Sequence, residues 1–171
     1  MAHQSNAACQ CGQTAIELTG APILNATCYC ESCRTAGHQF ERDLGAPQTV
    51  NANGGVEYCS YRKDRVKIAR GAQNLREFRL KPDSPTRRVV ALCCNSPMFV
   101  DFTPGHWLTI YRGRLPGTPP RSQMLLMTRD KPEGTQLPAG IPAYETMPPG
   151  FIFKLIASWA AMGFRRPKIV W

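Results

Sequence analysis

Short runs of alternating apolar and polar residues, separated by turn residues, fill most of the chain up to residue 102. The alternation predicts strands at 14–18, 23–29, 56–61, 65–70, 75–81, 86–92 and 99–102. Fourteen glycines and fifteen prolines divide the 171 residues so often that long helices are not expected over most of the length. We therefore expect a mainly β fold, built as one domain with a hydrophobic core.

The exception is a predicted helix at about residues 150–164, which follows Pro148-Pro149-Gly150. Its apolar positions share one face at helical spacing: Ile152, Leu155, Ile156 and Trp159. This face could pack on the rest of the chain or on a partner subunit, as in a homodimer formed through the C-terminal helix. It could instead lie on a membrane surface, since basic residues follow at 165–168. We expect residues 115–171 to form an extension packed on a domain of residues 1–114.

The net charge of +9, from 21 basic and 12 acidic residues, attracts anions without selecting among phosphate backbones, acidic membranes and carboxylate substrates. Aromatic residues do not alternate with the basic runs, so nucleic-acid binding is not expected. Residues 1–8 lack the pattern of a secretory signal, and no apolar stretch is long enough for a transmembrane segment. We expect a cytoplasmic protein, in which eight cysteines favour metal binding over disulfides.

Three cysteines fall within six residues, at Cys28, Cys30 and Cys33. Strand alternation places the first two on the same side, and we expect Glu31 and Ser32 to form a tight turn that returns the third. Three converging sulfurs match three corners of a zinc tetrahedron and leave the fourth corner free, as in catalytic zinc sites. The alternative is that these cysteines are unliganded or form disulfides.

Two neighbours of this cluster are candidates for chemistry. His38 lies five residues beyond Cys33 and could be a fourth ligand or a proton carrier. Arg34 could neutralise a thiolate or hold a substrate carboxylate. Each could equally be an ordinary surface residue.

The remaining cysteines include two further candidate metal-binding turns. Cys9-Gln10-Cys11-Gly12 is typical of a metal knuckle, in which glycine adopts a conformation that other residues resist. Cys93 and Cys94 lie at a predicted turn between two strands. Together the two turns could close one structural zinc site, whose binding energy would contribute to folding. Cys59 stands alone, and we expect it to be a small core residue.

The order C-x-C-G, C-x-C-x-x-C-R and a late cysteine turn before Ser96-Pro97 resembles the glutathione-dependent formaldehyde-activating enzyme family, whose zinc domain is shared with centromere protein V. The resemblance covers about residues 7–104. It implies an Mss4-like fold of short antiparallel sheets held by zinc, with one or two Zn²⁺ ions. It further implies a structural site formed by Cys9, Cys11 and the late turn, and an activity-linked site at Cys28, Cys30 and Cys33.

The late motif departs from the family pattern C-x-x-C-G. Ala91 stands where the first cysteine belongs, and Asn95 stands in place of the glycine. Asparagine tolerates a left-handed conformation, so we expect the turn to survive. Cys93 could supply the missing sulfur if the backbone bends there, because neighbouring strand side chains point in opposite directions. Four ligands, three ligands or an empty site remain alternatives.

The resemblance implies carbon–sulfur lyase chemistry: the glutathione thiol joins formaldehyde to give S-hydroxymethylglutathione. The enzyme hypothesis assigns this or a related thiol–aldehyde reaction to the three-cysteine cluster, with a small thiol as partner. The competing hypothesis is a non-catalytic zinc module that binds an anionic partner or another protein.

Overall fold

The computed structural model describes residues 4–171, so the first three residues of the predicted domain lie outside it. Its strands are β1 (Gln4–Ala8), β2 (Ala15–Thr19), β3 (Leu24–Cys28), β4 (Val56–Arg62), β5 (Val66–Arg70), β6 (Leu75–Phe78), β7 (Thr86–Ala91), β8 (Ser96–Phe102), β9 (Trp107–Tyr111) and β10 (Met124–Leu126). The α-helices are α1 (Glu31–Leu44) and α2 (Pro149–Ala160), and short 3₁₀ turns are η1 (Lys63–Arg65), η2 (Ala72–Asn74), η3 (Arg112–Arg114) and η4 (Thr128–Asp130). The mainly β fold with a C-terminal helix is confirmed.

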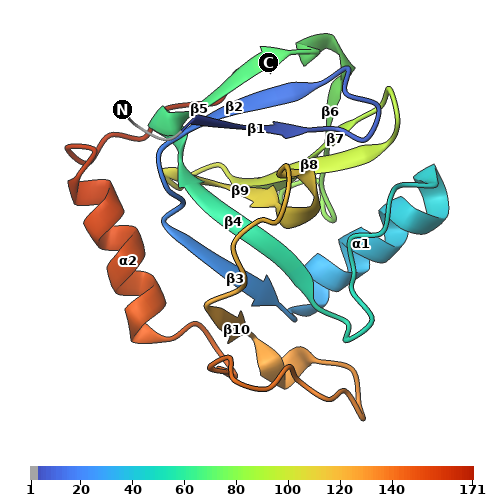
Figure 1. Cartoon of the computed structure of the whole chain (residues 1–171), viewed down its shortest axis with the longest axis vertical. Coiled ribbons are helices and arrows are strands. Elements are labelled where there is room, and N and C mark those ends of the chain that lie inside the picture. The colour runs from blue at the N-terminus through green and yellow to red at the C-terminus, as the bar shows by residue number, and fades with distance from the viewer. Residues whose placement is uncertain (1–3) are drawn as a thin grey trace.

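Two sheets form the body of the molecule (Figure 1). The smaller sheet has the strand order β1-β2-β5, and the larger has the order β10-β3-β4-β9-β8-β7-β6. Every pairing is antiparallel except that of β10 with β3, which is parallel. Strands that are distant in sequence, such as β3 and β10, therefore lie side by side.

The main core lies between the two sheets. Ile16 and Leu18 of β2 belong to one buried cluster there with Cys59 of β4 and Ile110 of β9. Because strand side chains alternate, Tyr58 of β4 and Tyr111 of β9 point to the opposite face of the larger sheet. The structure thus separates a packed inter-sheet core from a second face that carries the three-cysteine cluster.

The α1 helix corrects the sequence analysis, which expected a tight turn at Glu31 and Ser32. Both residues begin a helix of 14 residues. Its inward positions Ala36 and Phe40 pack on Val90 of β7, and Phe40 also meets the ring of Phe78 edge-on. Burial of this stripe against the sheet stabilises a helix that its own composition does not favour strongly.

Close contacts fix α1 to the loop before β4. A side chain at Gly37 would lie 2.5 Å from Val50 and 2.7 Å from Thr49, so glycine permits this approach. One turn later, the Glu41 carboxylate accepts hydrogen bonds from the backbone N–H groups of Thr49 and Val50, at 2.7 and 3.1 Å. The helix ends at Gly45, which is left-handed with φ of 63°.

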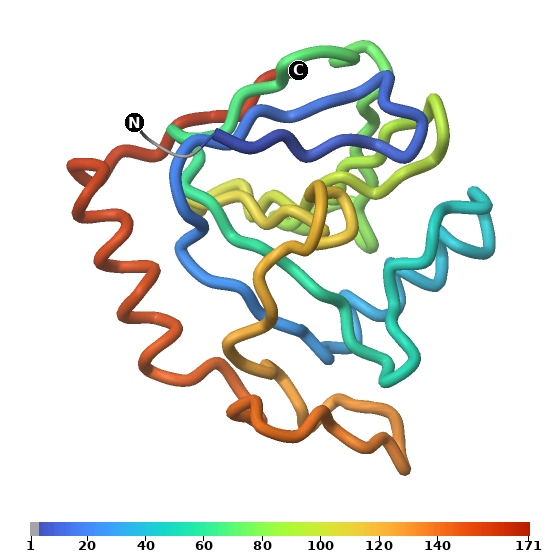
Figure 2. The backbone as a smooth tube through the Cα atoms, viewed as in Figure 1, coloured from blue at the N-terminus to red at the C-terminus, as the bar shows by residue number. Residues whose placement is uncertain are grey.

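The segment after residue 115 passes along one edge of the molecule and returns to the body (Figure 2). It contributes β10 to the larger sheet and then α2, which lies on the opposite flank from α1 (Figure 1). At its end, Ile169 is buried in the inter-sheet core and the Trp171 ring meets Phe99 edge-on at 5.6 Å. No helix within residues 4–171 is long and apolar enough to cross a membrane.

The predicted apolar face of the C-terminal helix is wrong in part. Leu155 does pack inward, but its buried companion is Phe151, and both contact residues of β3 and β10. Ile152 and Ile156 are exposed instead. The helix is apolar on both sides, so the spacing of apolar residues did not identify which side faces the sheet.

Candidate metal centres

The three-cysteine cluster forms at the junction of β3 and α1. Cys28 is the last residue of β3, Cys30 precedes the first residue of the helix, and Cys33 lies in its first turn. Tyr29, which separates Cys28 from Cys30 in the sequence, is fully buried. The three sulfurs lie within 4.8 Å of one another, and within residues 4–171 no other Cys, His, Asp or Glu joins this group. The helical turn brings Cys33 back in place of the expected tight turn.

The position at a helix start favours a negative charge on these thiols, because the first backbone N–H groups of a helix point toward its N-terminus. Hydrogen bonds from Cys28 and Cys33 lower the pKa of the Cys30 thiol well below its usual range. The same contacts, together with burial, raise the pKa of Cys28. A lowered pKa at Cys30 favours the thiolate, which is the form of cysteine that binds a metal cation.

A buried wall supports the cluster from the larger sheet. Cys28 and Cys33 pack against Tyr58 and Tyr111, whose ring centroids are 5.1 Å apart, together with two valines. Burial, followed by the charge of Cys33, raises the pKa of Tyr58, so its hydroxyl keeps its proton. That hydroxyl lies beside the Cys33 sulfur and has no aligned hydrogen-bond partner in the described chain. It is a proton donor held against a metal-ligand candidate.

The two candidate neighbours of the cluster have other contacts. His38 is exposed on α1, and its Nδ1 lies 3.6 Å from the Glu41 carboxylate. It is not in the group of converging ligand atoms among the described residues. Arg34 is half-buried and donates a hydrogen bond to the backbone carbonyl of Asp130. The arginine thereby joins the helix that carries Cys33 to the C-terminal segment.

We expect the Glu41→Gln substitution to destabilise the protein at neutral pH, by an amount that decreases as the pH falls through the lowered folded-state pKa of Glu41. Burial opposes the charge of Glu41, but hydrogen bonds from Thr49 and Val50 outweigh it and lower the pKa below 4.5. A carboxylate with a lowered folded-state pKa stabilises above its unfolded pKa and loses this contribution as the pH falls through the folded value. Hydrogen bonds to a charged group contribute about 2 kcal/mol. Urea unfolding of both proteins across pH measures the difference; an equal difference at all pH values would contradict it.

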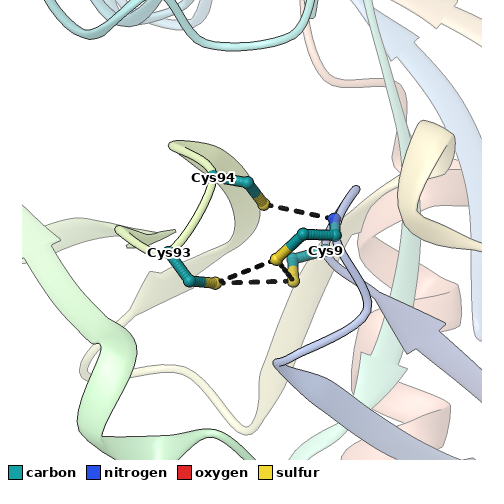
Figure 3. Close-up of side chains that lie close together, drawn as sticks. Cys9, Cys93 and Cys94 are labelled. Carbon is teal, nitrogen blue, oxygen red and sulfur yellow. Dashed lines mark hydrogen bonds between the residues drawn. The ribbon is translucent and has the colours of Figure 1, made fainter.

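The second group of cysteines joins two distant turns. The sulfurs of Cys9, Cys11, Cys93 and Cys94 all lie within 4.8 Å of one another. Figure 3 shows Cys93 pointing at Cys9, 84 residues earlier in the chain, while the Cys94 sulfur faces a backbone nitrogen. That nitrogen is the backbone N of Cys11, at 3.4 Å. Strand alternation does not separate Cys93 from Cys94, because β7 ends at Ala91 and both lie in the following turn.

The sulfur spacing fits a zinc ion. Zinc bonds to sulfur at about 2.3 Å in a tetrahedron, which holds the sulfurs roughly 3.8 Å apart. The separations here are 3.6 Å for Cys9–Cys11, 3.7 Å for Cys9–Cys93 and 3.5 Å for Cys11–Cys93. All eight cysteines have free thiols. Cys59 lies outside both groups in the core, as expected.

Polar neighbours orient these four sulfurs. The Ser96 hydroxyl lies 3.2 Å from the Cys94 sulfur and also accepts hydrogen bonds from the Gln10 backbone and Arg114. Burial opposes ionisation of Cys94, but the contacts with Ser96 and the Cys11 backbone lower its pKa to about 6. On the other side, the Thr14 backbone N–H donates to the Cys9 sulfur at 3.2 Å. Such outer contacts fix ligands in place and support a structural metal site.

Backbone conformation supports both turns. Gly12 has φ of 76°, as expected for the glycine after Cys11. Asn95 has φ of 53°, so asparagine does replace the glycine of the late motif in a left-handed position. Its side chain also donates a 2.7 Å hydrogen bond to the Leu44 carbonyl at the end of α1. The late turn is thereby joined to the helix of the three-cysteine cluster.

The basic residues around 62–67 are far from that cluster. In β4, Val56 pairs with Cys28, whereas Arg62 is at the other end of the strand, about 20 Å away at the rise of an extended chain. Arg62 is ion-paired with Asp64 at 2.6 Å. Lys63 is buried against Asp101 at 2.8 Å. These side chains stabilise the fold.

Sequence reasoning missed four residues that contact the sulfurs: Thr14, Tyr58, Ser96 and Tyr111. For Tyr58 the sequence contained a signal: in a strand at residues 56–61, Tyr58 and Cys59 point to opposite faces of the sheet, so a core position for Cys59 places Tyr58 on the other face. The others depend on pairings between distant segments, for which the sequence carries no local signal.

Comparisons with known proteins agree with these motifs. A family description, "Glutathione-dependent formaldehyde-activating enzyme", matches residues 4–115. A crystal structure of a Rhodobacter sphaeroides protein is similar with a TM-score of 0.47 and 18% identity, over 68% of this chain and 92% of that chain. No curated protein matches the chain. Because the family match at residues 4–115 covers more than half of the sequence, the chain belongs to the glutathione-dependent formaldehyde-activating enzyme family.

Proposed function

We propose that the protein is a zinc-dependent enzyme of the carbon–sulfur lyase type, which joins the glutathione thiol to formaldehyde. The observation that carries the proposal is the convergence of three cysteine sulfurs that no fourth protein ligand closes within residues 4–171. Catalytic zinc sites keep such a position for substrate, whereas structural sites use four protein ligands. The family match supports the choice of glutathione and formaldehyde.

In the proposed site, Cys28, Cys30 and Cys33 hold the metal, and Cys9, Cys11, Cys93 and Cys94 hold a structural zinc ion. Zinc supplies a Lewis acid and lowers the pKa of a thiol bound to it. The four-cysteine group keeps the late turn, and through Asn95 the end of α1, in position. The two groups thus have separate tasks, one chemical and one structural.

The reaction is an addition without oxidation or reduction. The bond between the glutathione sulfur and the formaldehyde carbon forms, the carbonyl π bond breaks, and the thiol proton moves to the former carbonyl oxygen. The product is S-hydroxymethylglutathione, and the reverse reaction releases both substrates. In this proposal the tyrosine wall excludes water from one side of the cluster. The protonated Tyr58 hydroxyl, which lies beside the Cys33 sulfur without an aligned partner, would limit the charge on that ligand once zinc is bound.

The direct test combines metal analysis with exchange NMR of glutathione and ¹³C-formaldehyde. We expect two zinc ions per chain and a faster rate of adduct formation and breakdown than the spontaneous rate. Removal of the weaker metal by a chelator should abolish the acceleration. Two bound zinc ions without any acceleration would support the non-catalytic module instead.

We expect Tyr58→Phe to lower the catalytic rate about tenfold, the lower end of the effect of residues that orient metal ligands. The hydroxyl has no aligned partner among the described residues, so its removal should leave the melting temperature unchanged or slightly higher. The measurement is exchange rate and thermal unfolding of the same samples. A loss of stability with an unchanged rate would show a purely structural role.

The matched control is Tyr61→Phe. Tyr61 lies three residues further along β4 and points to the inter-sheet core, away from the cysteine cluster. Its substitution removes the same atom from the same strand, and the rate should not change.

A further inference from the structure

The outward side of α2 is apolar. The helix buries Phe151 and Leu155 and leaves Ile152, Phe153 and Ile156 exposed, with 71% of Phe153 and 52% of Ile156 accessible. At 3.6 residues per turn, these three side chains lie within an arc of about 100°. Exposed apolar side chains scattered singly need no explanation, but a contiguous group marks a contact surface.

The apolar surface continues beyond the helix. Ile152 and Ile156 line a hollow of about 300 Å³ that extends to Phe102 and Trp107 of the larger sheet. Trp159 closes the hollow by stacking on His106, with 9° between the rings. Figure 1 shows α2 on the flank of the molecule, where no other helix or strand covers its outer side.

Basic side chains lie within α2 and in the segment that follows it. Exposed Lys154, Arg165, Arg166 and Lys168 all belong to the last 26 residues, 146–171, which contain no Asp or Glu. Arg166 lies 4.5 Å over the Trp159 ring and lines the hollow. The carboxylate of Asp64, near Arg165, is already ion-paired with Arg62. The apolar surface therefore belongs to a C-terminal segment whose exposed charged side chains are all basic, and one of them, Arg166, lines the hollow.

We propose that this α2 surface, defined by Ile152, Phe153, Ile156 and the basic residues 154, 165, 166 and 168, docks on membranes that contain anionic phospholipids. Apolar side chains enter the acyl boundary, and lysine and arginine side chains meet the headgroup phosphates, as in helices that lie in the plane of a bilayer. The helix is too short and insufficiently apolar to cross one. This inference is independent of the chemistry at the cysteines.

Charge decides between a membrane and a second copy of the chain. A two-fold dimer interface places the same patch on both subunits, so the basic residues of the two copies would face each other without acidic partners from residues 146–171. An anionic bilayer instead complements these basic residues. Exposed isoleucines contribute nothing to a nucleic-acid backbone, whereas a bilayer accommodates them.

The test is sedimentation of the full zinc-loaded chain with two kinds of vesicle, phosphatidylcholine alone and phosphatidylcholine mixed with phosphatidylserine. We expect binding to the mixed vesicles only, weakened by salt. The triple substitution Ile152→Ser, Phe153→Ser and Ile156→Ser should lower the partition coefficient at least about tenfold. Reversal of charge at Arg165, Arg166 and Lys168 to Glu should lower it about 100-fold.

The matched control reverses three exposed basic residues elsewhere: Lys67, Lys81 and Arg121. It changes the net charge equally and should retain most of the binding. All substituted side chains are exposed, so melting temperatures should stay the same. Failure to bind mixed vesicles, equal loss in the control, or unchanged binding of the serine variant would each overturn the proposal. A dimer in analytical ultracentrifugation that the serine variant dissociates would assign the surface to self-association instead.

Discussion

Replacement of Cys30 by serine is expected to abolish accelerated exchange between glutathione and formaldehyde, with a loss of at least about 100-fold, because it removes a metal ligand and not merely a neighbour of one. Cys30 is also the thiol of this cluster whose pKa is lowered by its hydrogen-bonded neighbours Cys28 and Cys33, which favours the metal-binding thiolate. Zinc content should fall from two ions per chain to one. The fold should persist, since Cys30 is only half-buried at the start of α1 and the four-cysteine group is untouched.

Cys59→Ala provides the control for this experiment. It also removes one sulfur, but from a core position outside both groups of cysteines. We expect it to retain two zinc ions and the full rate. Undiminished exchange in the Cys30→Ser protein would exclude the three-cysteine cluster as the catalytic site.

The Asp101→Asn substitution is expected to cause the largest loss of stability, about 3–5 kcal/mol, which lowers the melting temperature by about 10 °C. Asp101 binds Lys63 at 2.8 Å and Arg87 at 2.7 Å, and only 2% of Lys63 and 1% of Asp101 are accessible. Asparagine would leave the Lys63 ammonium buried without an opposite charge. Thermal unfolding of the zinc-loaded proteins measures the effect.

Two further variants separate burial of the charge from loss of a contact. The pair Lys63→Met with Asp101→Leu removes both buried charges and should recover most of the lost stability. Asp43→Asn makes the same chemical change in the exposed pair of Arg42 and Asp43, and should shift the melting temperature by less than about 2 °C. A mild effect of Asp101→Asn alone would show that water reaches Lys63.

The strands β2 to β8 and both cysteine turns could be predicted because their signals are local, whereas β1, β9 and β10 were not predicted. Alternation gave β4 and β7 almost to the residue, and Asn95 adopts the expected left-handed conformation. The α1 helix was missed because the segment from Cys28 to Cys33 was interpreted as an extended run followed by a tight turn at residues 31 and 32. Cys33, Ala36, Phe40 and Leu44 recur at helical spacing and could have indicated it.

The orientation of α2 and the partners of charged residues could not be predicted. Apolar residues occupy two sides of α2, and only the position of β3 and β10 decides that Leu155 is buried and Ile156 is not. Lys63 belongs to a basic run that is typical of a solvated surface, yet it is buried in η1 against Asp101 of β8. Such outcomes depend on tertiary contacts, which local sequence patterns do not encode.

The two groups of cysteines also differ in when they can exist during synthesis of the chain. The donors at 28, 30 and 33 leave the ribosome almost together, so a short nascent segment already has every sulfur of that group. Cys9 and Cys11 must wait until residues 93 and 94 have been translated. Until then the early turn has only two of its four thiols, and these two stay exposed to oxidants while residues 12–94 are translated.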